Sequence, residues 1–126
     1  MSTVPPAPDD DPDDAPIAVE VRGLATDRTL VTVKGQLDLH TAHRLGDALE
    51  PLLLADRQVL VDLSAVTFLD STGLTTLIHA HRTSRTTDAR LALIAPSAPV
   101  QQMLHLTGVD RVVNTYPSLD AVPHRT

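Results

Sequence analysis

The chain of 126 residues contains no cysteine and no tryptophan, and only one phenylalanine and one tyrosine. Without cysteine there is neither a disulfide framework nor thiolate chemistry, which is compatible with a reducing cytoplasm. No apolar run approaches the roughly 18 residues of a membrane span, and the N-terminus lacks the features of a secretory signal. The formal charge of −6 and the scarcity of aromatic side chains argue against a nucleic-acid partner. We therefore expect a small cytoplasmic domain that meets other proteins.

The first sixteen residues differ in composition from the rest. They hold five prolines and five aspartates and almost nothing large and apolar. Such a segment cannot bury enough surface to offset its ordering entropy, so residues 1–16 are predicted to form a disordered acidic tail. Residues 17–122 suffice for one two-layer domain, and 123–126 form a short C-terminal tail.

The order of elements predicts an α/β fold. Alternating apolar residues predict strands at 17–22 and 29–34, joined as an antiparallel hairpin, and Gly35 ends the second. A helix follows from about Thr41, which Pro51 should kink or end. Strands that then alternate with helices imply one mixed sheet of four to five strands with helices packed on it. The remaining predicted elements are a buried strand at 59–63, a helix to about 84, a strand at 90–94, a helix capped by Ser97 and Gly108, a short strand at 112–113 and a final turn at 117–119.

The stretch from Asp70 to Leu74 joins the buried strand to the following helix. Its hydroxyl groups therefore lie near a helix N-terminus, where backbone N–H groups are unpaired and the helix dipole is positive. Asp70, Ser71 and Thr72 are good capping residues. An exposed serine at this position could also be a substrate for a kinase, although caps are common at such positions. The stretch alone leaves both readings open.

Four segments in the same order and spacing resemble the STAS domain, specifically the stand-alone anti-sigma factor antagonists. The resemblance covers residues 17–122, nearly the whole predicted domain. The chain departs from the family pattern at Thr75, where many relatives have a small residue, and at its short C-terminus. The four segments are Gly35-Gln36-Leu37-Asp38 with Thr41-Ala42, Val61-Asp62-Leu63-Ser64, Phe68-Leu69-Asp70-Ser71-Thr72-Gly73-Leu74, and Thr107-Gly108-Val109-Asp110.

The resemblance implies a function in partner switching. The antagonist would bind an anti-sigma factor that is also an ATP-binding serine kinase, and so release a sigma factor. That kinase would phosphorylate Ser71 and end the complex, and a metal-dependent serine phosphatase would restore it. The implied partner-binding residues are Asp38, Asp70, Ser71, Thr72 and Gly73. No cofactor of its own is expected, because the kinase brings ATP and Mg²⁺, and a monomer is favoured.

Several alternatives compete with this interpretation. A STAS domain could instead be an interaction module without a switch, as a scaffold or a subunit of a lipid-transport or sensory complex. Asp38 could simply close a turn. Enzymes are disfavoured: Gly73 lies three residues after Asp70 rather than the two of an aspartic protease, and Leu69 stands where a Gly-x-Ser-x-Gly elbow needs glycine.

The histidines form no persuasive metal site. His40 and His43 are three residues apart and could share a helix face, but no third ligand is evident nearby. His79 and His81 diverge on a helix, and His81 is expected at the edge of the core.

Overall fold

The computed structural model describes residues 17–25, 27–55 and 58–123. The predicted tail 1–16 and the last three residues, 124–126, lie outside these ranges. The described elements, in chain order, are β1 (Ile17–Ala25), β2 (Arg28–Leu37), α1 (Ala42–Ala55), β3 (Gln58–Leu69), α2 (Ser71–Thr87), β4 (Arg90–Ile94), α3 (Ala98–Thr107), the 3-10 turn η2 (Val109–Arg111), β5 (Asn114–Tyr116) and the 3-10 turn η3 (Leu119–Ala121).

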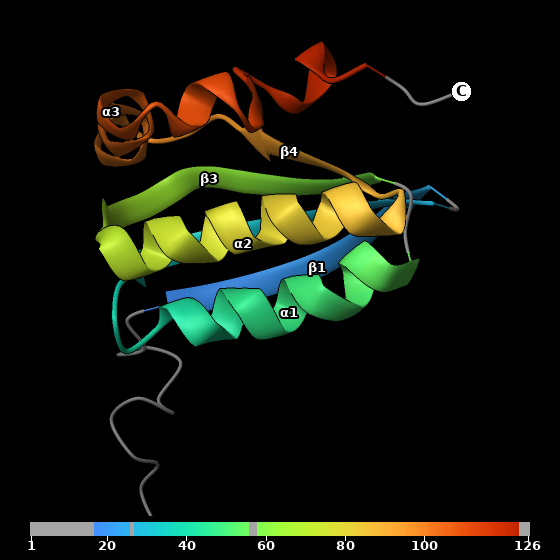
Figure 1. The fold of residues 1–126 in the computed structure, drawn as a ribbon, viewed down its shortest axis with the longest axis horizontal. Coiled ribbons are helices and arrows are strands. Elements are labelled where there is room, and N and C mark those ends of the chain that lie inside the picture. The colour runs from blue at the N-terminus through green and yellow to red at the C-terminus, as the bar shows by residue number, and fades with distance from the viewer. Residues whose placement is uncertain (1–16, 26, 56–57, 124–126) are drawn as a thin grey trace, which may run out of the picture.

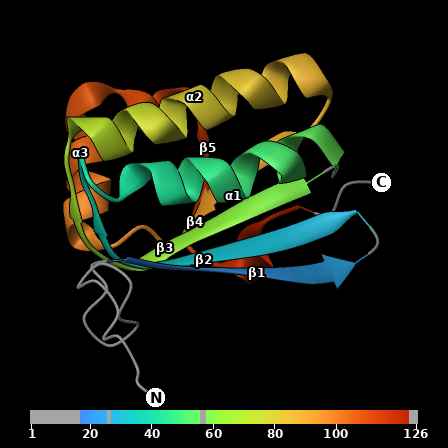
Figure 2. The same ribbon diagram turned by 90° about the horizontal axis from the view of Figure 1, so that it is seen from below.

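The strands form one mixed sheet in the order β1-β2-β3-β4-β5. β1 pairs antiparallel with β2, as the alternating pattern predicts, and the other neighbouring pairs are parallel. Helices α1 and α2 lie side by side on one face of the sheet (Figure 2). Their apolar sides and that face of the sheet enclose the main core, which includes Val31, Leu45, Leu63 and Leu77.

The opposite face of the sheet is covered by the C-terminal segment. Val122 is buried against Leu30, Leu60 and Ile94 in a second apolar cluster. The Gln58 amide donates a hydrogen bond to the Pro123 carbonyl at 3.2 Å, which fastens the segment to the start of β3. The predicted final turn is therefore a strap over a face that would otherwise expose apolar strands to water.

β2 and β3 are longer than the sequence indicates, and this difference positions the functional site. Gly35 does not end β2; it lies inside the strand with φ +106°, next to an irregularity in the pairing with β3. Glycine tolerates that conformation because it has no Cβ. Both strands then continue until Leu37 lies opposite Leu69. As a result, the two loops that follow them leave the same end of the sheet.

Two other expectations are corrected. Pro51 lies inside α1, which continues to Ala55; the proline is on the exposed side, so the Asp47 carbonyl that loses its N–H partner can meet water. Residues 112–113 are not a strand, because η2 follows Gly108 directly and the last strand begins at Asn114.

The capping residues of α3 stand where the sequence predicts them, although their bonds differ. Gly108 ends the helix with φ +76°. Ser97 occupies the N-cap position, but its hydroxyl donates to the Val66 carbonyl at 2.5 Å instead of capping the helix. This bond holds the start of α3 against the part of β3 that extends beyond β4.

Candidate functional site

A backbone hydrogen bond joins the two loops that carry the predicted site residues. The Asp70 N–H donates to the Leu37 carbonyl at 3.1 Å. Asp38 follows directly after Leu37, and Ser71 directly after Asp70. The structure thus brings all five predicted residues, Asp38 and 70–73, to one end of the sheet, where α2 begins (Figure 1).

Asp70 is the N-cap of α2. Its backbone is extended, with φ −101° and ψ −171°, and its Oδ1 accepts hydrogen bonds from the Thr72 and Gly73 N–H groups at 2.9 and 3.0 Å. Two of the helix's unpaired donors are therefore satisfied by a carboxylate, which also has the charge that the helix dipole favours. The capping interpretation is confirmed for Asp70, and it leaves the hydroxyl of Ser71 without a capping role.

Ser71 is the first residue of α2 and is exposed. Within the described part of the chain its hydroxyl makes no hydrogen bond, whereas its carbonyl accepts one from the Thr75 hydroxyl at 2.8 Å. Thr72 is half-buried beside it. Of these three hydroxyl groups, that of Ser71 combines exposure with a free oxygen, so it is the one that an approaching enzyme could reach.

Gly73 is buried where α2 meets the end of β2. A Cβ at this position would lie 2.7 Å from the Leu37 carbonyl oxygen and 2.6 and 2.9 Å from side-chain atoms of Leu69 and Leu37. Real Cβ atoms essentially never approach so closely. Glycine is therefore needed for packing, because it lets the helix touch the carbonyl that binds the Asp70 N–H.

Asp38 closes the turn before α1. Its Oδ1 accepts the His40 N–H at 2.9 Å, and its N–H donates to the Thr41 hydroxyl oxygen at 2.9 Å. The same Thr41 hydroxyl donates to the Gln36 carbonyl at 2.6 Å. Asp38 has the turn role that the sequence left open, and it remains half-buried, so its side chain still borders the surface near Ser71.

Two exposed apolar side chains next to these loops were not predicted as site residues. Leu39 is 69% exposed and Phe68 is 48% exposed. Leu39 comes two residues after Leu37, and Phe68 two residues before Asp70, so both are close in the chain to the bond that joins the loops. Large apolar residues in a loop and next to a motif are the signal that could have found them. We call Asp38, Leu39, Phe68, Asp70, Ser71 and Thr72 the Ser71 surface.

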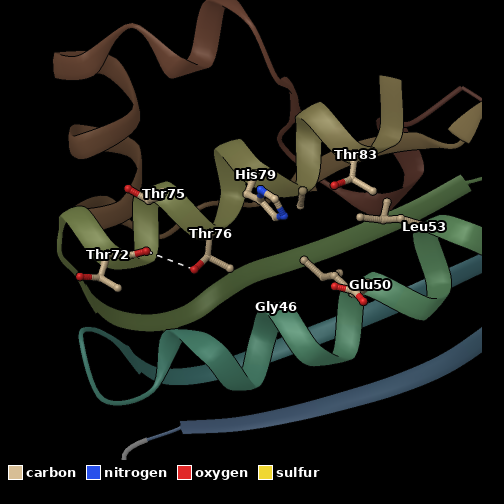
Figure 3. A pocket seen from close by; sticks show the side chains of 10 residues that line it. Gly46, Glu50, Leu53, Thr72, Thr75, Thr76, His79 and Thr83 are labelled. Carbon is tan, nitrogen blue, oxygen red and sulfur yellow. Dashed lines mark hydrogen bonds between the residues drawn. The ribbon is translucent and has the colours of Figure 1, made fainter. Parts of the chain in front are cut away.

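A groove of about 280 Å³ between α1 and α2 begins beside Thr72 (Figure 3). Leu49, Leu53 and Ala80 line it, with Glu50 and His79 from the two helices among the polar residues. Figure 3 also shows the bond from the Thr76 hydroxyl to the Thr72 carbonyl, 3.1 Å long. The Thr76 hydroxyl donates its hydrogen within α2 and not into the groove. The groove wall is mostly apolar.

The histidines do not assemble a metal site in the described ranges. His40 lies in the turn before α1 and His43 on that helix, and no group of three or more potential ligands forms among the residues placed there. His81 is partly buried; burial lowers its pKa, and the charge of Arg85 lowers the pKa further. None of the helices in the described ranges has the length and apolarity needed to cross a membrane.

The fold and site together define a class of small α/β domain that has helices on one sheet face and displays a serine where a central strand passes into a helix. The chain belongs to the STAS domain family, whose model matches residues 16–122. The family resemblance inferred from the four sequence segments is thereby confirmed, as is the α/β fold with a mixed sheet that begins in a hairpin.

Several similar proteins are named as anti-sigma factor antagonists. An anti-sigma-B factor antagonist of Listeria monocytogenes is 30% identical over 98 residues, which are 77% of this chain and 86% of the relative. The crystal structure of an anti-sigma factor antagonist from Mycobacterium paratuberculosis has a TM-score of 0.74 at 29% identity, covering 87% of this chain and 92% of that one. Unphosphorylated SpoIIAA, another anti-sigma factor antagonist, has a TM-score of 0.70 at 17% identity, covering 82% and 92%, which shows the fold alone.

Proposed function

We propose that this protein is an anti-sigma factor antagonist that works in the cytoplasm as a binding protein rather than an enzyme. It binds a serine-kinase anti-sigma factor through the Ser71 surface, and phosphorylation of Ser71 ends the complex. A metal-dependent serine phosphatase reverses the modification. The observation that carries the proposal is the hydroxyl of Ser71 at the start of α2, which is exposed and has no hydrogen-bond partner among the described residues. The names of the similar proteins support the antagonist role.

The composition of the Ser71 surface suits docking to a protein. Leu39 and Phe68 offer exposed apolar area, which releases water when a partner covers it. Asp38 and Asp70 add carboxylates whose positions are fixed by backbone N–H groups. Fixed groups lose little conformational freedom when a partner binds, so they contribute more of their contact energy to affinity.

The cap at Asp70 explains why a phosphate would act as a switch. A phosphoryl group adds a charge of about −1.5 to −2 and three acceptor oxygens. The Thr72 and Gly73 N–H groups, which could otherwise hold it, are already bound to the Asp70 carboxylate. Phosphate on Ser71 would therefore lie beside a like charge, with these two donors of the helix N-terminus already occupied. Solvent accommodates it in the free protein, but burial in an interface would leave it unpaired.

The expected effect on binding is large. If phosphorylation costs about 3 kcal/mol of binding free energy, affinity falls about a hundredfold, since 1.4 kcal/mol is a tenfold change. A switch of that size needs no change of fold in the antagonist.

The test is phosphorylation by the serine-kinase anti-sigma factors of the source organism with Mg²⁺ and ATP, read by intact mass. We expect one phosphate on the wild type and on Thr75→Ala, a matched control one helical turn away, and none on Ser71→Ala. Phosphate retained on Ser71→Ala would move the site to Thr72. Equal affinity of Ser71→Asp and wild type for the kinase would contradict the switch. If no kinase modifies or binds the protein, it is instead a STAS interaction module without a switch.

A further inference from the structure

A second pocket, which contains no residue of the Ser71 surface, has no role in the proposed function. It has a volume of about 370 Å³ and lies between the C-terminal half of α2 and the turn that follows α3. Sites for small molecules usually measure about 300–1,000 Å³, so its size suits a small ligand. Its arginines come from α2 and its valines from the segment after α3, so the two sides indicate what kind of ligand would fit.

The α2 wall is cationic. Ile78, His81, Arg82 and Arg85 line the pocket, and their spacing of three, four and seven residues places them on one helix face. Among the described residues that line the pocket there is no carboxylate, and α2 contains no acidic residue. Within the described ranges neither guanidinium forms an ion pair. Two arginines on one wall without a carboxylate are available for an anion from solution.

His81 is a further polar residue of the same wall. Its Nε2 is buried and has no hydrogen-bond partner among the described residues. Buried polar atoms are nearly always paired, so this nitrogen is available to a water or ligand that reaches it. Burial and the charge of Arg85 both lower the pKa of this histidine, so the ring is mostly neutral at pH 7.

The opposite wall is apolar. Val109 and Val112 come from the η2 turn and the residue after it, and Val112 is 61% exposed. The sequence predicted a strand at 112–113, which would have buried one of the two valines in the sheet. In the turn, too, one valine is buried: Val113 lies in the core, while Val112 is exposed among the residues that line the pocket.

We propose that this pocket binds a small carboxylate that has an apolar body, with Arg82 and Arg85 on the carboxylate and Ile78, Val109 and Val112 against the body. A guanidinium can hold both oxygens of a carboxylate with two parallel N–H bonds. The exposed apolar wall also favours binding, because covering it with a hydrocarbon group removes apolar surface from water. This inference does not depend on the proposed function.

The first test is a titration of the ¹⁵N-labelled full chain with octanoate, kept below its micelle-forming concentration and followed by amide NMR shifts. We expect saturable shifts at Gly108 and Val109. Acetate has the charge without the apolar body, and octanol the body without the charge, so each should bind at least tenfold more weakly. Octanoate shifts confined to Gly46 and Thr76 would place binding in the α1–α2 groove and overturn the proposal.

The second test separates the arginines from general charge effects. Arg82→Gln combined with Arg85→Gln should weaken octanoate binding at least tenfold, whereas Arg22→Gln, on the exposed edge strand β1, should leave it unchanged. Equal urea midpoints for both variants verify the fold. Unchanged affinity in the double variant refutes the carboxylate site. Saturation of the same amides by hexa-aspartate but not by octanoate would assign the pocket to an acidic peptide instead.

Discussion

Replacing Gly73 with alanine tests the contact that joins the two loops of the site. The added Cβ would lie 2.7 Å from the Leu37 carbonyl oxygen and below 3.0 Å from two side-chain carbons. Restoring ordinary contacts requires the start of α2 to move by roughly half an ångström. That movement also stretches the hydrogen bond from the Asp70 N–H to the same carbonyl, now 3.1 Å.

The net cost follows from three contributions. Overpacking of this kind costs about 1–3 kcal/mol, and the weakened hydrogen bond about 1 kcal/mol. Alanine regains about 1 kcal/mol of helix propensity relative to glycine. Gly73→Ala should therefore lower the free energy of unfolding by about 1–3 kcal/mol, despite a substitution that favours an isolated helix.

Gly46→Ala is the matched control, because it makes the same substitution inside α1. There the Cβ would meet only a Thr76 methyl at 3.7 Å, an ordinary contact. This variant should gain about 0.5–1 kcal/mol. Urea unfolding followed by circular dichroism measures both, provided that the m-values agree with the wild type. Equal or higher stability of Gly73→Ala would refute the close packing of α2 on the end of β2.

Three further predictions concern single side chains. Asp70→Ala removes the bonds to two N–H groups of α2 and should cost about 0.5–2 kcal/mol in the same urea assay, with Asp70→Asn recovering most of it. Thr41→Val leaves the Asp38 N–H and the Gln36 carbonyl without their hydroxyl partner and should cost about 1–3 kcal/mol, while Thr41→Ser retains the bonds. Because the folded protein lowers the pKa of His81 from its ordinary 6.5, the unfolded chain binds more protons in mildly acid solution. The contribution of His81 is thus fully present above pH 6.5 and is lost as the pH falls towards the lowered pKa, so the stability difference between wild type and His81→Gln should change between pH 7.5 and 5. A pH-independent difference would contradict this assignment.

Local sequence signals predicted those features that depend on a few neighbouring residues. The hairpin followed from alternation, the cap at Asp70 from its side chain, and the end of α3 from Gly108. Each of these features depends on residues that are close together in the chain, so the local sequence is enough to predict it.

Features that depend on distant pairing were missed. Gly35 breaks the alternating pattern, yet the parallel partner β3 supports β2 beyond it to Leu37. Pro51 was expected to kink or end α1, but it does not end it: the helix, packed on the sheet, continues to Ala55. In both places tertiary contacts outweigh a local preference. The coverage of the second sheet face by Val122 was likewise invisible, because no local pattern tells which strand face lacks a helix.

The same distinction applies to the site. The sequence motif predicted the residues from Asp70 to Gly73 as a site and the family pattern added Asp38, but neither indicated that Leu39 and Phe68, close to them in the chain, would be exposed. The exposure of these two side chains depends on where β2 and β3 end in the fold, and the sequence did not predict those ends correctly.

The bond between the Asp70 N–H and the Leu37 carbonyl uses main-chain atoms alone. Any residue type except proline at position 70 can donate it, and any residue at 37 can accept it. Exposed side chains beside this bond, such as Leu39 and Phe68, can therefore vary among related proteins without loosening it. A cell with several such antagonists could insulate one signalling route from another by exchanging Leu39 and Phe68 while it keeps the serine at a constant position.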